Sequence, residues 1–211
     1  MAKILILGAG IAGHTAASHL RRKLSKEHEV WVVSPNRNYQ WVPSNIWVGI
    51  GRMKSEEVFF PLEPLYKRKG IGYKQAKVIS FHPEGDSTES KGFVTVEYIF
   101  GENAGVQEKV NYDFLINATG PKLAFELTEG LNPGTNKAYS VCTYEHATHA
   151  SEALLKLIAD IKASDKKAKI LIGTGHARAT CQGAAFEYIL NVEKELVRFG
   201  VRQNIELTWI T

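Results

Sequence analysis

The stretch Gly8-Ala9-Gly10-Ile11-Ala12-Gly13 decides the fold, because it stands between a short apolar run and a helical pattern. The run over residues 3–7 (Lys-Ile-Leu-Ile-Leu) predicts a buried strand. The helical pattern continues to about residue 22, and residues 29–34 (Glu-Val-Trp-Val-Val-Ser) predict a second strand. A strand, a glycine-rich turn, a helix and a second strand in this order predict a β-α-β unit that binds a dinucleotide.

Each glycine of this motif has its own physical task. Gly8 allows a tight turn, Gly10 lets the backbone approach a pyrophosphate, and Gly13 lets the helix pack closely on the strand. The second strand ends at Ser34 without the acid that often binds the ribose, so a serine hydroxyl, backbone groups or Asn36 would have to replace it. The motif alone therefore leaves NAD, FAD and an ordinary glycine turn without a ligand open.

The composition is that of an ordinary soluble globular chain. Of its 211 residues, 44% are hydrophobic and 23% are charged, which allows one or two domains with a sizeable core. Its 26 basic and 22 acidic residues give a net charge of +4, too small an excess to indicate a nucleic-acid partner. No apolar run reaches the ~18 residues of a membrane span. The apolar start of the chain reads as a strand rather than as a signal peptide.

The middle of the chain carries weaker signals. Residues 39–51 are aromatic with Pro and Gly breaks, and they predict a loop that covers the core or contacts a cofactor. Residues 61–69 predict a short helix, and residues 72–81 predict a strand. Residues 93–100 and 106–112 alternate like the two strands of an antiparallel hairpin, which indicates a β-meander.

A further strand signal follows the meander. Residues 112–120 (Tyr-Asp-Phe-Leu-Ile-Asn-Ala-Thr-Gly) predict a buried strand that ends in small residues. Small side chains are what a backbone needs in order to pass close to a cofactor, although a plain strand and turn would also explain them. Residues 143–161 then predict a helix.

The end of the chain repeats the order of strand, turn and helix. A strand over residues 169–173 leads into Gly173-Thr174-Gly175-His176-Ala177-Arg178 and a helix to about residue 198. Arg178 stands where a dinucleotide fingerprint would have its third glycine, so we expect a second Rossmann-like unit without a complete NAD(P) site. Residues 204–210 predict one more strand, and we expect the chain to be the front half of a longer protein.

Together these residues resemble the sulfide:quinone oxidoreductases, which are flavoproteins of the two-dinucleotide disulfide-reductase superfamily. The resemblance covers nearly the whole chain. The glycine motif and the Ala118-Thr119-Gly120 turn alone would mark only the superfamily. The narrower markers are the loop Val42-Pro43-Ser44-Asn45 with Trp47-Val48-Gly49, the segment Cys142-Thr143-Tyr144-Glu145-His146, and Cys181 ahead of Gly183-Ala184-Ala185-Phe186.

The resemblance implies an α/β fold in which successive parts of the chain form different domains. Residues 1–122 would form a Rossmann-type FAD-binding domain with an antiparallel β-meander. Residues 123–168 would form a connecting segment and a helix. Residues 169–211 would be the first part of a second dinucleotide-binding-like domain.

The resemblance also implies FAD as the cofactor. The pyrophosphate would be held by Gly8, Ala9, Gly10, Ile11 and Ala12, and the ribose and adenine would lie at Ser34 and Pro35. The remaining contacts would come from Val42 and Pro43 beside the flavin, Lys77 and Val78 at the adenine, and Ala118, Thr119 and Gly120 closing over the cofactor.

The resemblance gives the two cysteines a redox task. Cys181 would stand at the flavin face, and Cys142 would be the second redox cysteine. In such enzymes sulfide attacks a cysteine disulfide or a bridging polysulfide, a thiolate passes two electrons to the flavin, and the flavin reduces a membrane quinone. The thiolate is the nucleophile in this chemistry, and His146 could move the proton, with His176 and Glu145 as weaker candidates. Without the resemblance, a lone cysteine is more often a small buried hydrophobe, and His146 a surface or cap residue.

The implied partners are sulfide and quinone, with peripheral membrane contact in the intact protein and no nucleic acid; a homo-oligomer is left open. No metal is expected, because His146 and His149 share a helix face without an evident third ligand. The family places a third cysteine, the quinone site and the membrane-binding helices in its second half. We therefore expect this chain alone to be soluble and unable to complete turnover from sulfide to quinone.

Three alternatives stay open. The chain could belong to a flavocytochrome c sulfide dehydrogenase or to a type II NADH dehydrogenase-like flavoprotein, although Arg178 argues against the NADH site. It could also be a flavin- or nucleotide-binding module without catalysis. Thiols that do not react at neutral pH would favour the module. A disulfide-stapled fold has the least support.

Overall fold

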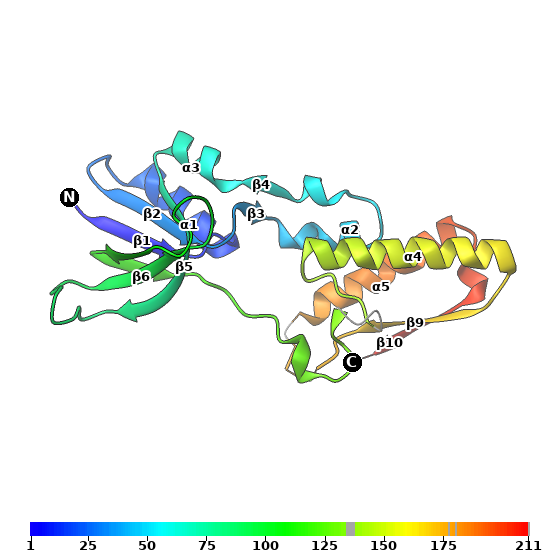
Figure 1. Cartoon of the computed structure of the whole chain (residues 1–211). Coiled ribbons are helices and arrows are strands. Elements are labelled where there is room, and N and C mark those ends of the chain that lie inside the picture. The colour runs from blue at the N-terminus through cyan, green and yellow to red at the C-terminus, as the bar shows by residue number, and fades with distance from the viewer. Residues whose placement is uncertain (134–137, 177, 180, 211) are drawn as a thin grey trace. The chain divides into compact units, whose positions relative to one another are not determined.

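The computed structural model describes residues 1–133, 138–176, 178–179 and 181–210. The chain forms two compact units (Figure 1). Unit 1 comprises Met1–Gln40 and Phe59–Lys122, and unit 2 comprises Trp41–Val58 and Leu123–Thr211. The functional assignment of residues 1–122, 123–168 and 169–211 stays a prediction.

Unit 1 is built on a six-stranded sheet in the order β7-β6-β5-β2-β1-β8. Its central strands are parallel, with Leu7 of β1 opposite Val33 of β2 and Asn117 of β8. The antiparallel pairs β5–β6 and β6–β7 form the meander, as the alternating sequence predicts. The strands are β1 (Lys3–Leu7), β2 (Glu29–Ser34), β5 (Gly72–His82), β6 (Phe93–Tyr98), β7 (Gln107–Asn111) and β8 (Phe114–Asn117).

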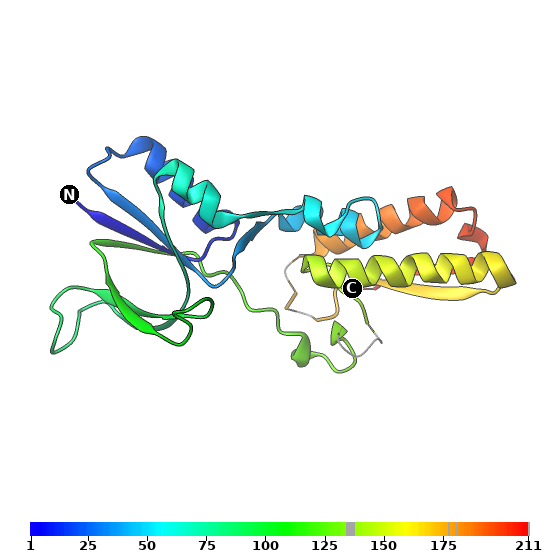
Figure 2. The same ribbon diagram turned by 45° about the horizontal axis from the view of Figure 1, so that its top comes forward.

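Alternation along the strands gives the sheet of unit 1 two apolar faces. One face, with Ile6 and Val32, packs against the helices α1 (Ile11–Lys23) and α3 (Leu62–Lys69), which lie together on one side of the sheet in Figure 2. The other face, with Leu5 and Val33, packs against residues of the meander such as Val96. Burying each of these branched side chains contributes about 1.5–3 kcal/mol. The predicted α/β class with a β-meander is therefore confirmed.

Two expectations about unit 1 and its neighbour segment are wrong. Residues 39–51 are not a loop, because they contain part of β3 (Asn38–Gln40), the turn η1 (Val42–Ser44) and the short helix α2 (Asn45–Gly49). β3 pairs with β4 (Phe59–Pro61), and the intervening Trp41–Val58 belongs to unit 2. The helix forms because its apolar side chains are buried in that unit, which is a tertiary effect that outweighs local propensity.

The strand β8 is more exposed than its sequence predicts. Its first residue, Phe114, is 63% exposed. Among the described strands β8 lies at the edge of the sheet, beyond β1, so its outer side has no strand partner there. Leu115 and Ile116 are partly buried and pack against the two cores of unit 1, whereas Phe114 and Asn117 at the ends of the strand are exposed.

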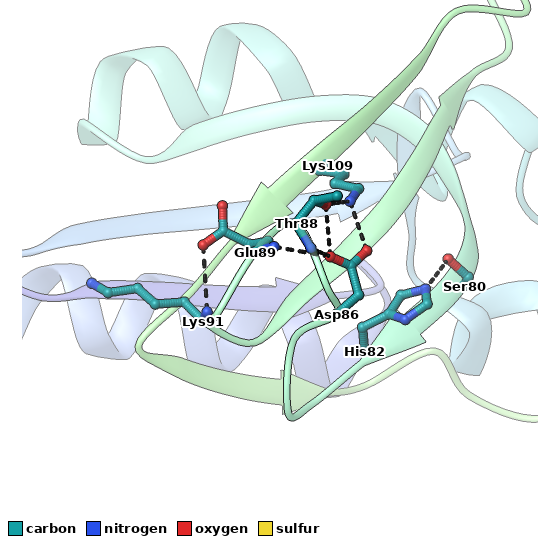
Figure 3. Close-up of polar contacts among 7 residues, drawn as sticks. All are labelled: Ser80, His82, Asp86, Thr88, Glu89, Lys91 and Lys109. Atoms are coloured by element: carbon teal, nitrogen blue, oxygen red, sulfur yellow. Dashed lines mark hydrogen bonds and ion pairs between the residues drawn. The ribbon is translucent and has the colours of Figure 1, made fainter.

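A polar cluster ties the β5–β6 loop to the meander (Figure 3). The Asp86 carboxylate accepts hydrogen bonds from the backbone N–H groups of Thr88 and Glu89 at 2.8 and 2.9 Å and from the Thr88 hydroxyl at 2.7 Å. Lys109 Nζ of β7 donates to the same carboxylate at 2.8 Å. These hydrogen bonds, with that of Lys109 first, hold the pKa of Asp86 well below its usual range. The cluster fixes the β5–β6 loop to β7, and its hydrogen-bonding groups pair with one another.

Unit 2 has two parallel strands, β9 (Ala168–Gly173) and β10 (Ile205–Ile210), and two long helices, α4 (Tyr144–Ser164) and α5 (Gln182–Arg198). Its core is formed by apolar residues of α4, α5 and the strands, namely Leu154, Ile158, Ile161, Val192, Leu196, Val201 and Ile205, with Ile50 from the Trp41–Val58 segment. The turns η2 (Ser55–Glu57), η3 (Phe125–Leu127) and η5 (Arg202–Asn204) complete it. The predicted second strand–turn–helix order is present. In the part of the chain that the structure describes, no helix has the length and apolar character to cross a bilayer.

Candidate functional site

The turn between β1 and α1 is tightly closed around its glycines. Gly8 has φ +96°, and a Cβ on it would lie 2.2 Å from the carbonyl oxygen of Ala118. A Cβ on Gly13 would lie 2.0 Å from the carbonyl oxygen of Gly8 and 3.3 Å from Ala118 Cβ. The strand, the helix and the start of the β8 turn thus meet where only small groups fit. The structure confirms the tight turn predicted at Gly8 and the close packing predicted at Gly13.

Gly10 differs from these two glycines because a Cβ on it would meet no atom within 4 Å. It is the N-cap of α1, and neither a side-chain cap nor an acid in the first turn covers the helix N-terminus. Free backbone N–H groups and the helix dipole favour an anion here. This open approach fits the pyrophosphate of a dinucleotide, which is the group that the sequence places there.

The Ser34 hydroxyl at the end of β2 is less accessible to a ribose than the sequence predicts. Ser34 is only 1% exposed, and its hydroxyl oxygen accepts a hydrogen bond from the Asn36 backbone N–H at 3.2 Å. The Asn36 carbonyl accepts a hydrogen bond from the Tyr73 hydroxyl at 2.6 Å. Pro35 and Asn36 are the exposed groups at this point. A ribose would therefore meet backbone and Asn36 before it meets the Ser34 hydroxyl.

Two further predicted contacts lie beyond the carboxyl ends of the parallel strands. Ser34, the last residue of β2, pairs with Gln75 of β5, so Lys77 and Val78 continue past the end of β2. After β8, Asn117 Oδ1 accepts hydrogen bonds from the backbone N–H and the hydroxyl of Thr119, at 3.2 and 2.9 Å. Ligands of open α/β sheets bind at this edge of the sheet. Unit 1 thus brings Gly8–Ala12, Ser34–Pro35, Lys77–Val78 and Ala118–Gly120 to one edge of its sheet.

The predicted redox residues all lie in unit 2, as do Val42 and Pro43. Cys142 and Cys181 are free thiols, and both are exposed. Cys142 precedes α4, and Cys181 is the N-cap of α5. Each cysteine therefore stands just before a long helix, rather than inside the core where an unreactive cysteine would lie.

His146 lies in the first turn of α4, next to the Cys142 segment. Its backbone N–H donates to the Thr143 hydroxyl at 3.2 Å, which makes Thr143 the N-cap of the helix. Its ring packs edge-on against Phe125 at 5.3 Å. The buried Nδ1 atom has no hydrogen-bond partner within the described residues. Of the weaker candidates, His176 Nδ1 accepts a hydrogen bond from the Arg178 backbone N–H at 3.0 Å.

Gly49 joins the two segments that carry the cysteines, which the sequence did not reveal. The partly buried Tyr188 of α5 donates its hydroxyl proton to the Gly49 carbonyl oxygen at 2.9 Å, and desolvation raises the pKa of this tyrosine. A Cβ on Gly49 would lie 2.7 Å from Val141 Cγ1, beside Cys142, and 3.0 Å from Tyr188 Cε2. Only a glycine at the end of α2 lets both neighbours approach so closely.

The buried carboxylate of Glu195 also holds the Trp41–Val58 segment, through Arg52. Glu195 of α5 is 2% exposed and accepts hydrogen bonds from Arg52 at 2.6 Å and from Arg198 at 2.8 Å. Burial opposes the charged form, but the two guanidinium groups outweigh it and lower the pKa of Glu195.

Within the described residues, no group of three or more His, Cys, Asp or Glu side chains could hold a metal ion.

Comparison with known proteins decides the family. The model of the pyridine nucleotide-disulphide oxidoreductases matches residues 2–186. The chain belongs to this family. The chain is 27% identical over 212 residues to a sulfide-quinone reductase of Aquifex aeolicus, a match that covers 100% of this chain and 43% of the relative. It is 24% identical over 213 residues to a mitochondrial sulfide:quinone oxidoreductase of Dictyostelium discoideum, covering 97% of this chain and 41% of the relative.

A solved structure agrees with these matches. The X-ray structure of the sulfide:quinone oxidoreductase from Aquifex aeolicus aligns with a TM-score of 0.77 at 26% identity, covering 100% of this chain and 43% of that chain. The resemblance to sulfide:quinone oxidoreductases inferred from the motifs is therefore confirmed, as is the Rossmann-type fold. The family member described here spans less than half the length of these relatives.

Proposed function

We propose that this chain is the flavin-binding part of an FAD-dependent sulfide:quinone oxidoreductase that acts through Cys181 and Cys142. The observation that carries the proposal is the open approach to Gly10 at the start of α1, in a chain that a sulfide-quinone reductase of Aquifex aeolicus matches over its full length. The activity towards quinone is a proposal for the whole protein, because the chain covers 43% of its Aquifex relative.

The residues of unit 1 would hold the cofactor. Backbone N–H groups of Gly8–Ala12 would bind the pyrophosphate, assisted by the dipole of α1. Backbone groups at Pro35 and Lys77–Val78 would meet the ribose and the adenine beyond the strand ends. The small side chains at Ala118–Gly120 leave the backbone accessible to the ring system. When bound, FAD supplies two-electron acceptance and transfer to a quinone.

The residues of unit 2 would carry the sulfur chemistry. Sulfide would attack a sulfur of the oxidised cysteine pair, so that one sulfur–sulfur bond forms while another breaks and a cysteine thiolate leaves. Cys181 would present this thiolate to the flavin, and Cys142 would carry the added sulfur. His146 would hold the proton that leaves sulfide, since its Nδ1 has no other partner within the described residues. Val42 and Pro43 would line the flavin.

A visible spectrum of the purified chain tests this proposal. We expect a flavin absorption band that bleaches when sulfide is added without air. Cys181→Ala should keep the band and prevent its bleaching. A flavin band that sulfide does not bleach in the unmodified chain would remove the sulfide reaction and leave a binding module. A folded chain without flavin, even after it is offered FAD, would contradict the cofactor assignment.

A pair of glycine variants isolates the cofactor site from stability. Gly10→Ala places a methyl group in open space and in a backbone conformation that alanine accepts, so folding should be unaffected. Because the methyl group stands where the pyrophosphate would approach, flavin affinity should fall by at least about tenfold. Gly183→Ala in α5 is the matched control for stability, since a Cβ on Gly183 also meets open space.

A further inference from the structure

A hollow of about 470 Å³ lies on unit 1, beside the exposed side of α1 and the last residue of α3. It begins beyond the glycine turn and is separate from the Gly10 approach. Its lining contains imidazoles, hydroxyls and cations but no carboxylate. The lining residues are His14, Thr15, Ser18, His19, Arg21, Arg22 and Lys69.

The cations of this hollow stand in the last turns of α1 and α3. Basic residues in the last turn of a helix complement its dipole. Arg21 has this structural role, because its guanidinium donates to the carbonyl oxygens of His28, Leu24 and Ser25 at 2.6, 3.0 and 2.5 Å. Arg22 lies 3.3 Å from His19 Nδ1, and neither Arg22 nor Lys69 has a carboxylate partner among the described residues. Both side chains are exposed, and no carboxylate lines the hollow to balance their charge.

The polar groups beneath these cations also point to a ligand. The Ser18 hydroxyl is buried and has no hydrogen-bond partner within the described part of the chain. A buried unpaired hydroxyl costs about 1–3 kcal/mol, so a native structure has a reason to keep one. His14 Nδ1 is already paired with the Tyr66 hydroxyl at 3.1 Å, and burial together with the Lys69 ammonium lowers the pKa of His14. A phosphoryl oxygen would give the Ser18 hydroxyl an acceptor, and its negative charge would offset the positive charge of the lining.

We propose that this hollow binds a phosphoryl anion, either a soluble phosphate compound or the phosphomonoester headgroup of a lipid. Arg22 and Lys69 would supply the charge, and the exposed Thr15 hydroxyl would donate a hydrogen bond to a phosphoryl oxygen. The Ser18 hydroxyl would donate a second one after a change of its rotamer turns it outward. The site is independent of the flavin and of the proposed redox function. It rests on the lining of the hollow, the absence of acids from that lining and the orphaned Ser18 hydroxyl.

The soluble source is tested with inorganic phosphate and pyrophosphate on the full chain, using the imidazole C–H resonances of His14 and His19. We expect saturable shifts of both rings at physiological salt. Lys69→Gln and Ser18→Ala should each weaken binding by about tenfold. Arg68→Gln is the matched control, because it removes a cation from the same turn of α3 that does not line the hollow.

The Ser18→Ala variant tests whether the Ser18 hydroxyl binds the ligand or is merely unpaired in the fold. If the hydroxyl is only an orphan, the variant is more stable and binds phosphate unchanged, which would overturn the proposal. Sulfate that binds as tightly as phosphate, with both lost at physiological salt, would also overturn it, because this is the behaviour of screened surface charge. If Lys69→Gln disturbs folding in a circular-dichroism melt, Arg22→Gln provides the same test.

The lipid source is tested by flotation with phosphatidylcholine vesicles, with and without phosphatidic acid. Binding that requires phosphatidic acid and is lost in Lys69→Gln, but not in Arg68→Gln, would identify a headgroup as the ligand. Binding of free phosphate alone would identify the soluble source. Binding of neither probe would overturn the site.

Discussion

The two glycine turns of this chain share a Gly-x-Gly spacing but differ in what occupies the space around them. In unit 1, α1 begins at Ile11, directly after Gly10, and the space in front of Gly10 is open. In unit 2, α5 begins only at Gln182, well past Gly175. A Cβ on Gly175 would lie 1.9 Å from Leu131 Cδ1, so the protein's own side chain fills the corresponding space.

Glycine spacing alone therefore does not make a dinucleotide site. The first turn combines close packing at Gly13 with open access at Gly10, which is what a backbone needs to contact a pyrophosphate. In the second turn the glycines serve packing: a Cβ on Gly173 would lie 1.7 Å from the Ile210 carbonyl oxygen of the neighbouring strand. This explains in structural terms why Arg178 can stand where a third glycine would be needed.

The largest expected effect comes from breaking the first turn. Gly13→Ala drives a methyl group into the Gly8 carbonyl, a backbone atom that cannot turn aside, and should destabilise unit 1 by about 3 kcal/mol. Urea denaturation monitored by circular dichroism measures this. Gly10→Ala is the control and should unfold at the same urea concentration as the unmodified chain. Equal stability of Gly13→Ala and Gly10→Ala would contradict the close packing described here.

The same substitution in unit 2 sharpens the contrast. Gly173→Ala meets a backbone carbonyl and should cost about 2 kcal/mol, whereas Gly175→Ala meets the end of a flexible leucine and should cost less than 1 kcal/mol. Thermal melts of the two variants check the order. Combining Gly175→Ala with Leu131→Ala should remove the clash, so the two changes should not be additive. Additivity would show that Leu131 does not fill the turn.

A further difference between the units lies in how their helices are anchored. α1 is held by glycine packing, but α5 is held by the buried Glu195 between Arg52 and Arg198. Glu195→Gln removes the charge while keeping the shape, and should destabilise unit 2 by about 2 kcal/mol, since both arginines retain partial access to water. Denaturation at neutral pH measures the loss. Arg22→Gln, whose guanidinium pairs with no described acid, should leave stability nearly unchanged.

The smallest expected effect concerns acid. The pKa of Asp86 is lower in the folded chain than the ~3.9 of an unfolded aspartate, so its stabilisation is complete above that value and is lost as the pH falls through the folded pKa. Asp86→Asn should therefore lower the Tm slightly at neutral pH, and the difference from the unmodified chain should vanish in strong acid. Melts across this pH range test the prediction, with Glu84→Gln as a control in the same loop. A difference that grew in acid would contradict it.

The sequence predicts the elements whose signals are local, and it does not predict contacts between segments that are far apart in the chain. β1, α1 and β2 were predicted nearly to their ends, because the strand pattern, the glycines and the helix are all local. Helix α2 was missed because its burial depends on α4 and α5, far along the chain. The contacts of Leu131 with Gly175 and of Tyr188 with Gly49 also join residues far apart in the chain, so the sequence does not reveal them. The predicted cofactor contacts of unit 1 share one sheet edge because strand order follows from the β-α-β motif. The sequence did not show which groups there are exposed.

The excursion of Trp41–Val58 into unit 2 has a consequence for synthesis on the ribosome. The chain leaves unit 1 after Gln40 and returns at Phe59, and the β3–β4 ladder clamps both ends of this excursion. When Lys122 has emerged, unit 1 has all its strands, yet Ile46 and Val48 still lack α4 and α5 to cover them. A nascent chain of this length carries a closed apolar loop on a finished sheet. Apolar surface exposed in this way makes folding intermediates prone to aggregate, so we expect the nascent chain to be most prone to aggregate before the second unit emerges.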